Sequence, residues 1–289
     1  MESLKEEIQK KKPNLSKGSV STYMSLLKSL YKKADTQTPV LEWINKQDEN
    51  IALLKDVNPS VRKTVLSALV CVADQNDKYK VLMMKDGEKY VEQMKKQEKS
   101  PAQVENWQTQ EQIKEVYEKL LNENKELLKK EELNNNEFQK LQNLIIMSLY
   151  YLIPPRRLKD YTDFKIKAID KKKDNYKQGN KLKFNAYKTD KYYGEQTVEA
   201  PPTLNKLLNK FIKLNKNDYL LVDSNNNKLS SVKLNQRLNA IFNKKVSVNI
   251  LRHSYLSNMY QGIPALTKME ETAENMGHSI KEALQYIKK

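Results

Sequence analysis

The spacing of apolar residues changes along this chain of 289 residues, and that change limits the folds it can adopt. Up to about Tyr151, apolar residues recur every three or four positions, which predicts amphipathic helices. Between Tyr161 and Ala200, short runs alternate between apolar and polar residues and are separated by polar turns, which predicts about three short strands. Helical spacing resumes after Pro201-Pro202. We therefore expect a mainly α chain with a small antiparallel β-sheet, an α+β fold.

A polar stretch divides the helical part of the sequence. Residues Lys95 to Ser100 show no apolar period and are followed by Pro101, which is typical of a linker. We predict a helical N-terminal domain over residues 1–95 and a linker over residues 96–106. The second predicted domain, over residues 107–289, contains the sheet.

The charge of the chain favours an anionic partner. Its 52 Lys and Arg residues outnumber its 36 Asp and Glu residues, so the formal charge is +16. Nucleic acid is the commonest partner of such a chain, ahead of an anionic membrane surface and an acidic protein. Runs of Asn beside abundant Lys are also typical of AT-rich genomes, such as those of viruses and mobile elements. Charge alone favours nucleic acid over this compositional explanation.

Several classes of protein are excluded by simple features. Cys71 is the single cysteine, so neither a disulfide framework nor a zinc cluster is expected, and the compartment should be reducing. The longest apolar run, residues 144–155, is well short of the roughly 20 residues of a membrane span. The N-terminus mixes acids with lysines, unlike a secretory signal. We expect an intracellular protein without membrane, metal or cofactor.

Two basic clusters lie in the middle of the sequence. An apolar helix ends at Pro154-Pro155 and presents Arg156 and Arg157, whose guanidinium groups can fork onto a phosphate. The alternative is a surface arginine pair with Asp160 as its ion-pair partner. Lys188 stands in a turn that closes one predicted strand, where its amine could reach a phosphodiester. Most hairpin lysines are merely solvated.

Two further clusters lie near the C-terminus. Asn249 and Arg252 are three residues apart on a predicted helix and share a face, and His253 beside them could equally be a partly buried histidine. In Gly277-His278-Ser279, the serine begins a capping box with Glu282, which predicts a last helix from Ser279. Tyr286 stands about two turns along that helix. A tyrosine at such a place is most often a packing residue.

The order of these clusters resembles the tyrosine recombinase (phage integrase) family, whose active site type IB topoisomerases share. The resemblance covers the organisation of the whole chain. It is sharpest in Leu251-Arg252-His253-Ser254-Tyr255 and in Met276-Gly277-His278-Ser279 through Tyr286. It implies that residues 1–95 form a core-binding domain that clamps DNA and that residues 107–289 form the catalytic domain.

The resemblance also implies a role for each residue. Tyr286 would be the nucleophile that attacks a DNA phosphodiester and leaves a 3′-phosphotyrosyl link and a free 5′-hydroxyl. Arg157 and Arg252 would hold the two non-bridging oxygens, as metal ions do in other phosphoryl transfers. Lys188 would be the general acid for the departing 5′-oxygen. His278 would hydrogen-bond the phosphate.

The sequence departs from the family pattern at Asn249, and it leaves open which residue is the first arginine. The usual motif is H-x-x-R, and Asn249 stands at its first position. Asparagine donates a hydrogen bond but does not exchange a proton near neutral pH, so phosphate binding survives and acid–base chemistry does not. The first arginine is ambiguous. Because the family tends to place an acid three residues after it and Asp160 follows Arg157 by three, we choose Arg157 over Arg156.

The sequence thus predicts a site-specific DNA recombinase or integrase that breaks and rejoins strands without metal or ATP. A type IB topoisomerase with the same chemistry is one alternative. A DNA-binding protein that keeps the fold and has lost the reaction is another, motivated by Asn249. The expected partners are double-stranded DNA and further copies of the chain, as a dimer or tetramer on DNA. The expected location is wherever the target DNA lies, in the nucleus or cytoplasm of a host.

Overall fold

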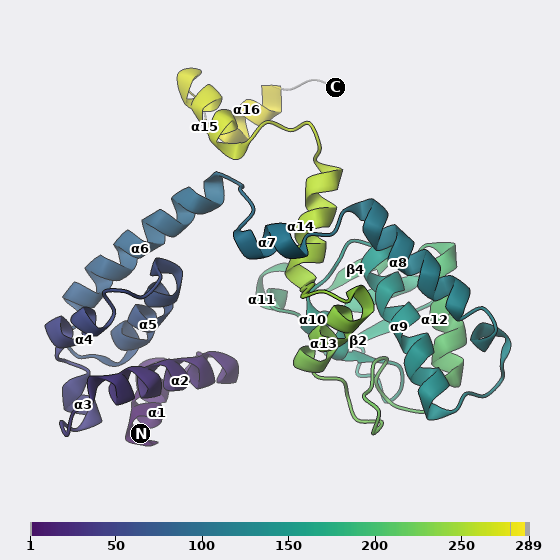
Figure 1. The fold of residues 1–289 in the computed structure, drawn as a ribbon, viewed down its shortest axis with the longest axis horizontal. Helices are drawn as coiled ribbons and strands as arrows, with labels where there is room; N and C mark the ends of the chain where they lie inside the picture. Colours follow the sequence, from purple (N-terminus) through teal and green to yellow (C-terminus); the bar gives the residue numbers. More distant parts are fainter. Residues whose placement is uncertain (1, 278, 287–289) are drawn as a thin grey trace. The chain divides into compact units, whose positions relative to one another are not determined.

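The computed structural model describes residues 2–277 and 279–286, and for residues 285 and 286 it describes the backbone alone. The chain divides into two compact units (Figure 1). Residues 1–98 and 264–289 make the first, which we call the N-terminal unit. Residues 99–263 make the second, which we call the central unit. The predicted domain boundaries at residues 95 and 106 stay a prediction.

The described part of the N-terminal unit is helical, as the apolar spacing predicts. Its helices are α1 (Glu2–Lys11), α2 (Lys17–Ala34), α3 (Val40–Trp43), α4 (Gln47–Leu53), α5 (Pro59–Val72), α6 (Asp77–Lys95), α15 (Leu266–Asn275) and α16 (Ile280–Tyr286). Helix α5 begins with a proline after Asn58, whose side chain accepts from the Ser60 amide. Helices α5 and α6 form a hairpin against which α1 and α2 pack (Figure 1).

A buried ion pair joins the two helices of that hairpin. Arg62 on α5 donates from Nε and Nη2 to the two carboxylate oxygens of Asp86 on α6, both at 2.7 Å. The Asp86 side chain is fully buried and that of Arg62 is 14% exposed. The hydrogen bonds to Asp86 raise the pKa of Arg62. The two-pronged geometry offsets the desolvation of both charges.

Removing one partner of this pair should destabilise the N-terminal unit. We expect Asp86→Ala to lower its free energy of unfolding by about 3 kcal/mol, because the change leaves Arg62 partly buried without a counter-charge. Urea unfolding followed by fluorescence of the buried Trp43, in a Trp107→Phe background, would report on this unit. Asp48→Ala breaks the exposed pair with Lys78 and should leave the midpoint nearly unchanged. Equal midpoints for the two variants would contradict this account.

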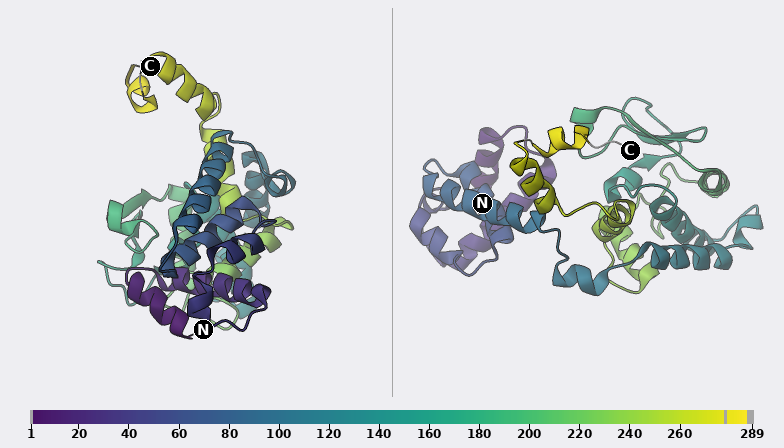
Figure 2. Two further views of the ribbon diagram at one scale, coloured as in Figure 1. Left: turned by 90° about the vertical axis from the view of Figure 1, so that its left-hand side faces the viewer. Right: turned by 90° about the horizontal axis from the view of Figure 1, so that it is seen from above.

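The last two helices extend the N-terminal unit as a short hairpin (Figure 2). The Leu266 amide at the start of α15 donates to Gln97 Oε1 at 2.9 Å, and Glu270 pairs with Lys95 of α6 at 3.0 Å. Helix α16 begins as the sequence predicts: the Ser279 amide donates to Glu282 Oε2 at 2.8 Å, and the Glu282 amide donates to Ser279 Oγ at 3.3 Å.

The central unit combines helices with one small sheet. Its elements are α7 (Pro101–Asn106), α8 (Gln110–Glu123), the 3-10 turn η1 (Leu127–Lys129), α9 (Asn135–Tyr151), α10 (Leu158–Thr162), β1 (Phe164–Lys165), β2 (Asn175–Gln178), β3 (Lys181–Phe184), α11 (Asp190–Tyr193), β4 (Gln196–Glu199), α12 (Pro202–Leu214), α13 (Ser231–Phe242) and α14 (Val248–Met259). Every residue of α9 from Leu144 to Tyr150 is buried. Helices α8 and α12 pack on α9 (Figure 1).

The predicted fold class is confirmed, and the sheet differs from the prediction in two details. It has four strands in the order β1-β2-β3-β4 rather than about three. Strands β3 and β4 pair antiparallel as predicted. Strand β2 pairs antiparallel with β3, whereas β1 pairs parallel with β2, with Phe164 opposite Asn175. Strand β2 went unpredicted because its sequence, Asn-Tyr-Lys-Gln, shows no apolar alternation. Residues Asp190–Tyr193, which lie in the range where short strands are predicted, form the short helix α11 instead.

In the part of the chain that the structure describes, no helix combines the length and the apolar character that crossing a bilayer demands.

Candidate functional site

The end of helix α9 places the two central arginines. Pro154 and Pro155 follow the helix and cannot continue it, because a proline ring excludes the preceding residue from helical geometry. The chain turns there, and Arg157 becomes the extended N-cap residue of α10, with φ −70° and ψ 155°. Arg156 and Arg157 thus lie in the short connection between the buried helix α9 and α10.

Arg156 is held by contacts to three neighbouring elements. Its Nε donates to Asp160 Oδ2 on α10 at 2.9 Å, and its Nη1 donates to Gln196 Oε1 on β4 at 3.0 Å. Its guanidinium carbon lies 3.9 Å from the centre of the Phe184 ring, and 5.3 Å from that of Tyr187. Burial raises the pKa of Asp160, and the charge of Arg156 acts in the opposite direction. Arg156 therefore joins α10 to the sheet.

Arg157 and Arg252 have no such partners. Neither side chain makes an ion pair or a hydrogen bond with any residue that the structure describes. Burial lowers the pKa of Arg252 on α14, and the positive charge of Arg157 lowers it further, while Asp160 raises it. Two guanidinium groups that repel each other, one of them partly desolvated, favour an anion between them. Their planar donor sets match the oxygens of a phosphate.

Lys188 lies in the turn after β3, next in sequence to a residue that contacts Arg156. We call Arg156, Arg157 and Arg252 the arginine cluster. Strand β3 ends at Phe184, and the turn after it carries Tyr187, whose ring faces Arg156 and whose hydroxyl donates to the Gly194 carbonyl at 2.7 Å. Lys188 is the next residue. Its side chain is exposed and pairs with no residue that the structure describes. The turn thus carries an unpaired ammonium group beside the arginine cluster.

Asn249 is the second residue of α14, one turn before Arg252. Its side chain is exposed and makes no hydrogen bond within the described chain. Ser247 begins the helix by accepting from the Ile250 amide, and Ser254 Oγ is paired with Gln110 Nε2 of α8 at 2.8 Å. These bonds fasten both ends of the segment that carries Asn249 and Arg252. His253, expected either near the site or partly buried, is exposed.

The two remaining predicted residues lie in the C-terminal segment. Tyr286 is the last residue of α16, in the N-terminal unit, and its side chain is outside the described atoms. His278 lies outside the described residues. Within the central unit, the charge of Arg157 acts on Arg252, and Tyr187, the residue before Lys188, has its ring centre 5.3 Å from the guanidinium carbon of Arg156.

Comparison with known proteins adds one structural likeness. No protein-family model matches the chain, and no curated protein matches it in sequence. The crystal structure of XerA recombinase is similar in fold at 12% sequence identity, with a TM-score of 0.39. The alignment covers 97% of this chain and 91% of that one.

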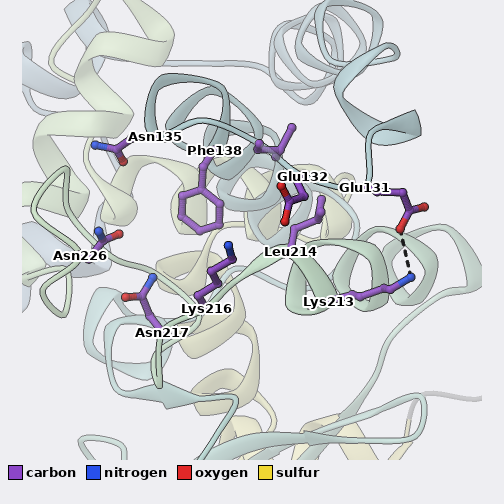
Figure 3. Close-up of a pocket in the computed structure, with 10 residues that line it drawn as sticks. Glu131, Glu132, Asn135, Phe138, Lys213, Leu214, Lys216, Asn217 and Asn226 are labelled. Carbon is purple, nitrogen blue, oxygen red and sulfur yellow. Dashed lines mark hydrogen bonds and ion pairs between the residues drawn. The ribbon is translucent and has the colours of Figure 1, made fainter.

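A depression of about 370 Å³ lies elsewhere in the central unit (Figure 3). Phe138 lies in the middle of it, and Glu131 forms an ion pair with Lys213 at its edge, at 3.3 Å. It is lined by residues at the start of α9, whereas the arginines follow the end of that helix. Since α9 has 17 residues, the two places are about 25 Å apart along its axis. This depression contains none of the predicted site residues.

Three residues at the arginine cluster were missed by sequence reasoning. Gln196 binds Arg156, and Asn175 binds the backbone of both α10 and the Lys188 turn. The hydroxyl of Tyr150 is buried without a hydrogen-bond partner among the described residues. Burial raises its pKa well above the usual value, and Arg252 acts in the opposite direction. Isolated polar residues give no local signal, because only the fold assembles them.

Proposed function

We propose that this chain is a site-specific DNA recombinase that cuts and rejoins strands through a 3′-phosphotyrosine. The observation that carries the proposal is the pair of unpartnered guanidinium groups, Arg157 and Arg252, with the unpaired Lys188 on the adjoining turn. Their order in the sequence, followed by His278 and Tyr286, supports the same reaction. Double-stranded DNA is the proposed substrate, and dimers or tetramers on DNA are the proposed assembly.

The arginine pair suits a reaction at phosphorus. In the proposed reaction each guanidinium binds one non-bridging oxygen and stabilises the negative charge that grows on the pentacoordinate phosphorus. Both arginines project from packed elements, Arg157 from the N-cap of α10 and Arg252 from α14, so their backbone positions are set before DNA binds. The formal charge of +16 would draw DNA to the protein, with a strong dependence of affinity on salt.

The proposed step exchanges one ester for another. The phenolic oxygen of Tyr286 forms a bond to phosphorus and releases its proton to water, and the bond from phosphorus to the 5′-oxygen breaks. Lys188 gives a proton to that 5′-oxygen, which leaves as a hydroxyl. The energy of the broken ester stays in the phosphotyrosine, so attack by a 5′-hydroxyl reverses the step without ATP.

Incubation with DNA in EDTA, followed by an SDS quench, tests this proposal. The proposal predicts DNA covalently attached to the protein, on supercoiled DNA that carries the ends of the protein's own genetic element. Attachment confined to those ends would favour a recombinase, and relaxation of any supercoiled plasmid would favour a type IB topoisomerase. Salt-sensitive binding without attachment on any DNA would favour the DNA-binding protein that has lost the reaction, and would overturn the proposal.

Replacing Lys188 should slow cleavage in a way that depends on the leaving group. We expect Lys188→Ala to reduce the cleavage rate of an ordinary phosphodiester by about 100-fold, because the departing 5′-oxygen loses its proton donor. In a substrate with sulfur at the bridging 5′ position, the leaving group is a thiolate that needs no protonation. The variant should therefore cleave this substrate at nearly the wild-type rate. Single-turnover formation of the covalent product measures both. Equal slowing of the two substrates would refute the role of Lys188 as the acid.

A further inference from the structure

Asn175, the first residue of β2, uses every hydrogen-bonding capacity of its side chain. Its Nδ2 donates to the carbonyls of Asp160 and Ala186, both at 2.9 Å. Its Oδ1 accepts from the amides of Asn185 and Ala186, both at 2.8 Å. The residue is fully buried. An amide group can make these four bonds at once and a carboxylate or a hydroxyl cannot.

These four bonds join α10, which follows the two arginines, to the turn that carries Lys188. Asp160 belongs to α10 and holds Arg156 through its carboxylate, while its carbonyl is held by Asn175. Ala186 begins the turn that leads, two residues later, to Lys188. The side chain of Asn175 therefore sets the distance between the backbone that carries the arginines and the backbone that carries the lysine.

We propose that Asn175 is a positioning residue. It holds the backbone of the turn so that the ammonium group of Lys188 reaches the departing 5′-oxygen. This inference rests on the proposed function. Asn175 touches neither the DNA nor the reacting atoms in this account and acts through the turn. Proton transfer is sensitive to small displacements, and a misplacement of about 1 Å can cost about 100-fold in rate. The loss of Asn175 should therefore resemble the loss of Lys188.

Asn215 offers a matched control in the same unit. It is 2% exposed, and its Nδ2 donates to the carbonyls of Tyr219 and Leu220 at 3.0 and 3.1 Å. Its Oδ1 accepts from the amide and the side chain of Asn217, both at 3.0 Å. Alanine at either position removes four hydrogen bonds of a buried asparagine. Only Asn175 is bonded to the turn that carries Lys188.

The experiment compares Asn175→Ala, Asn215→Ala and Lys188→Ala on two substrates, one with oxygen and one with sulfur at the bridging 5′ position. We expect Asn175→Ala to slow cleavage of the oxygen substrate by about tenfold or more and to recover most of the loss on the sulfur substrate. The cleavage rate of Asn215→Ala, relative to that of wild type, should be the same on the oxygen substrate and on the sulfur substrate. The double variant Asn175→Ala with Lys188→Ala should be no slower than Lys188→Ala alone, since both changes remove one function.

Each outcome separates the inference from the proposed function. If wild type attaches to neither substrate, the proposed function fails and the inference falls with it. If Lys188→Ala recovers on sulfur and Asn175→Ala is equally slow on both substrates, Asn175 has only a structural role and the inference alone is overturned. If the thermal transition of Asn175→Ala shows that it does not fold, Asn175→Ser, which keeps one donor and one acceptor, replaces it under the same criteria.

Discussion

Tyr286→Phe should abolish covalent attachment to DNA. The variant lacks the one oxygen that can form the phosphotyrosine, so no adduct should survive an SDS quench at any reaction time. Its noncovalent affinity for DNA should stay within about twofold of wild type, because a single hydroxyl contributes little to binding that phosphate contacts dominate. Gel separation after the quench measures the adduct, and titration of labelled duplex measures the affinity.

Tyr260→Phe is the matched control for that change. Tyr260 also stands at the end of a helix, is largely exposed and lies in the central unit. It should form the adduct at the wild-type rate. Persistence of the adduct in Tyr286→Phe, or its loss in Tyr260→Phe, would contradict the assignment of the nucleophile.

Arg252→Ala should reduce the rate of adduct formation by about 100- to 1000-fold, because it removes a positive group from the place where negative charge develops. Arg157→Ala should have a loss of similar size. Arg252→Lys should recover little of the activity, since an ammonium group does not offer the planar, two-pronged donor set of a guanidinium. Single-turnover rates at saturating protein separate this effect from any change in DNA affinity.

Arg237→Ala controls for the removal of a partly buried arginine. Burial lowers the pKa of Arg237 as it does that of Arg252. In contrast to Arg252, Arg237 has partners, because it donates to Asn143 Oδ1 at 3.0 Å and to Gln139. Its loss should lower stability and leave the rate of the folded fraction unchanged. A wild-type rate for Arg252→Ala, or equal losses for the two variants, would contradict the proposed anion site.

The helices and the fold class could be predicted from the sequence because they rest on local patterns. Ser279 before Glu282 marks a helix start that the structure confirms. Helix α7 lies within the predicted linker, where Ser100 and Gln103 form a capping box. Strand β2 could not be predicted, since its pairing with β1 and β3 and the burial of Asn175 depend on distant residues.

The choice between the two central arginines shows what the sequence leaves open. Asp160 follows Arg157 by three residues, and that spacing was the reason for choosing Arg157. In the structure the carboxylate of Asp160 accepts a hydrogen bond from Arg156 instead, and Arg157 is the extended N-cap residue of α10. Arg157 is thereby left without an ion pair among the described residues. The spacing of three residues between Arg157 and Asp160 therefore does not correspond to a contact between their side chains, because Asp160 binds Arg156.

Mapping the covalent product tests the central claim most directly. The protein would be incubated in EDTA with end-labelled duplex from its own genetic element, quenched with SDS and digested with trypsin. The account predicts that a 5′ label stays with the protein, as a 3′-phosphate link requires, and that the nucleotide is carried by the peptide of residues 282–288, on Tyr286. No adduct, an adduct that retains the 3′ label, or a nucleotide on any other peptide would contradict it.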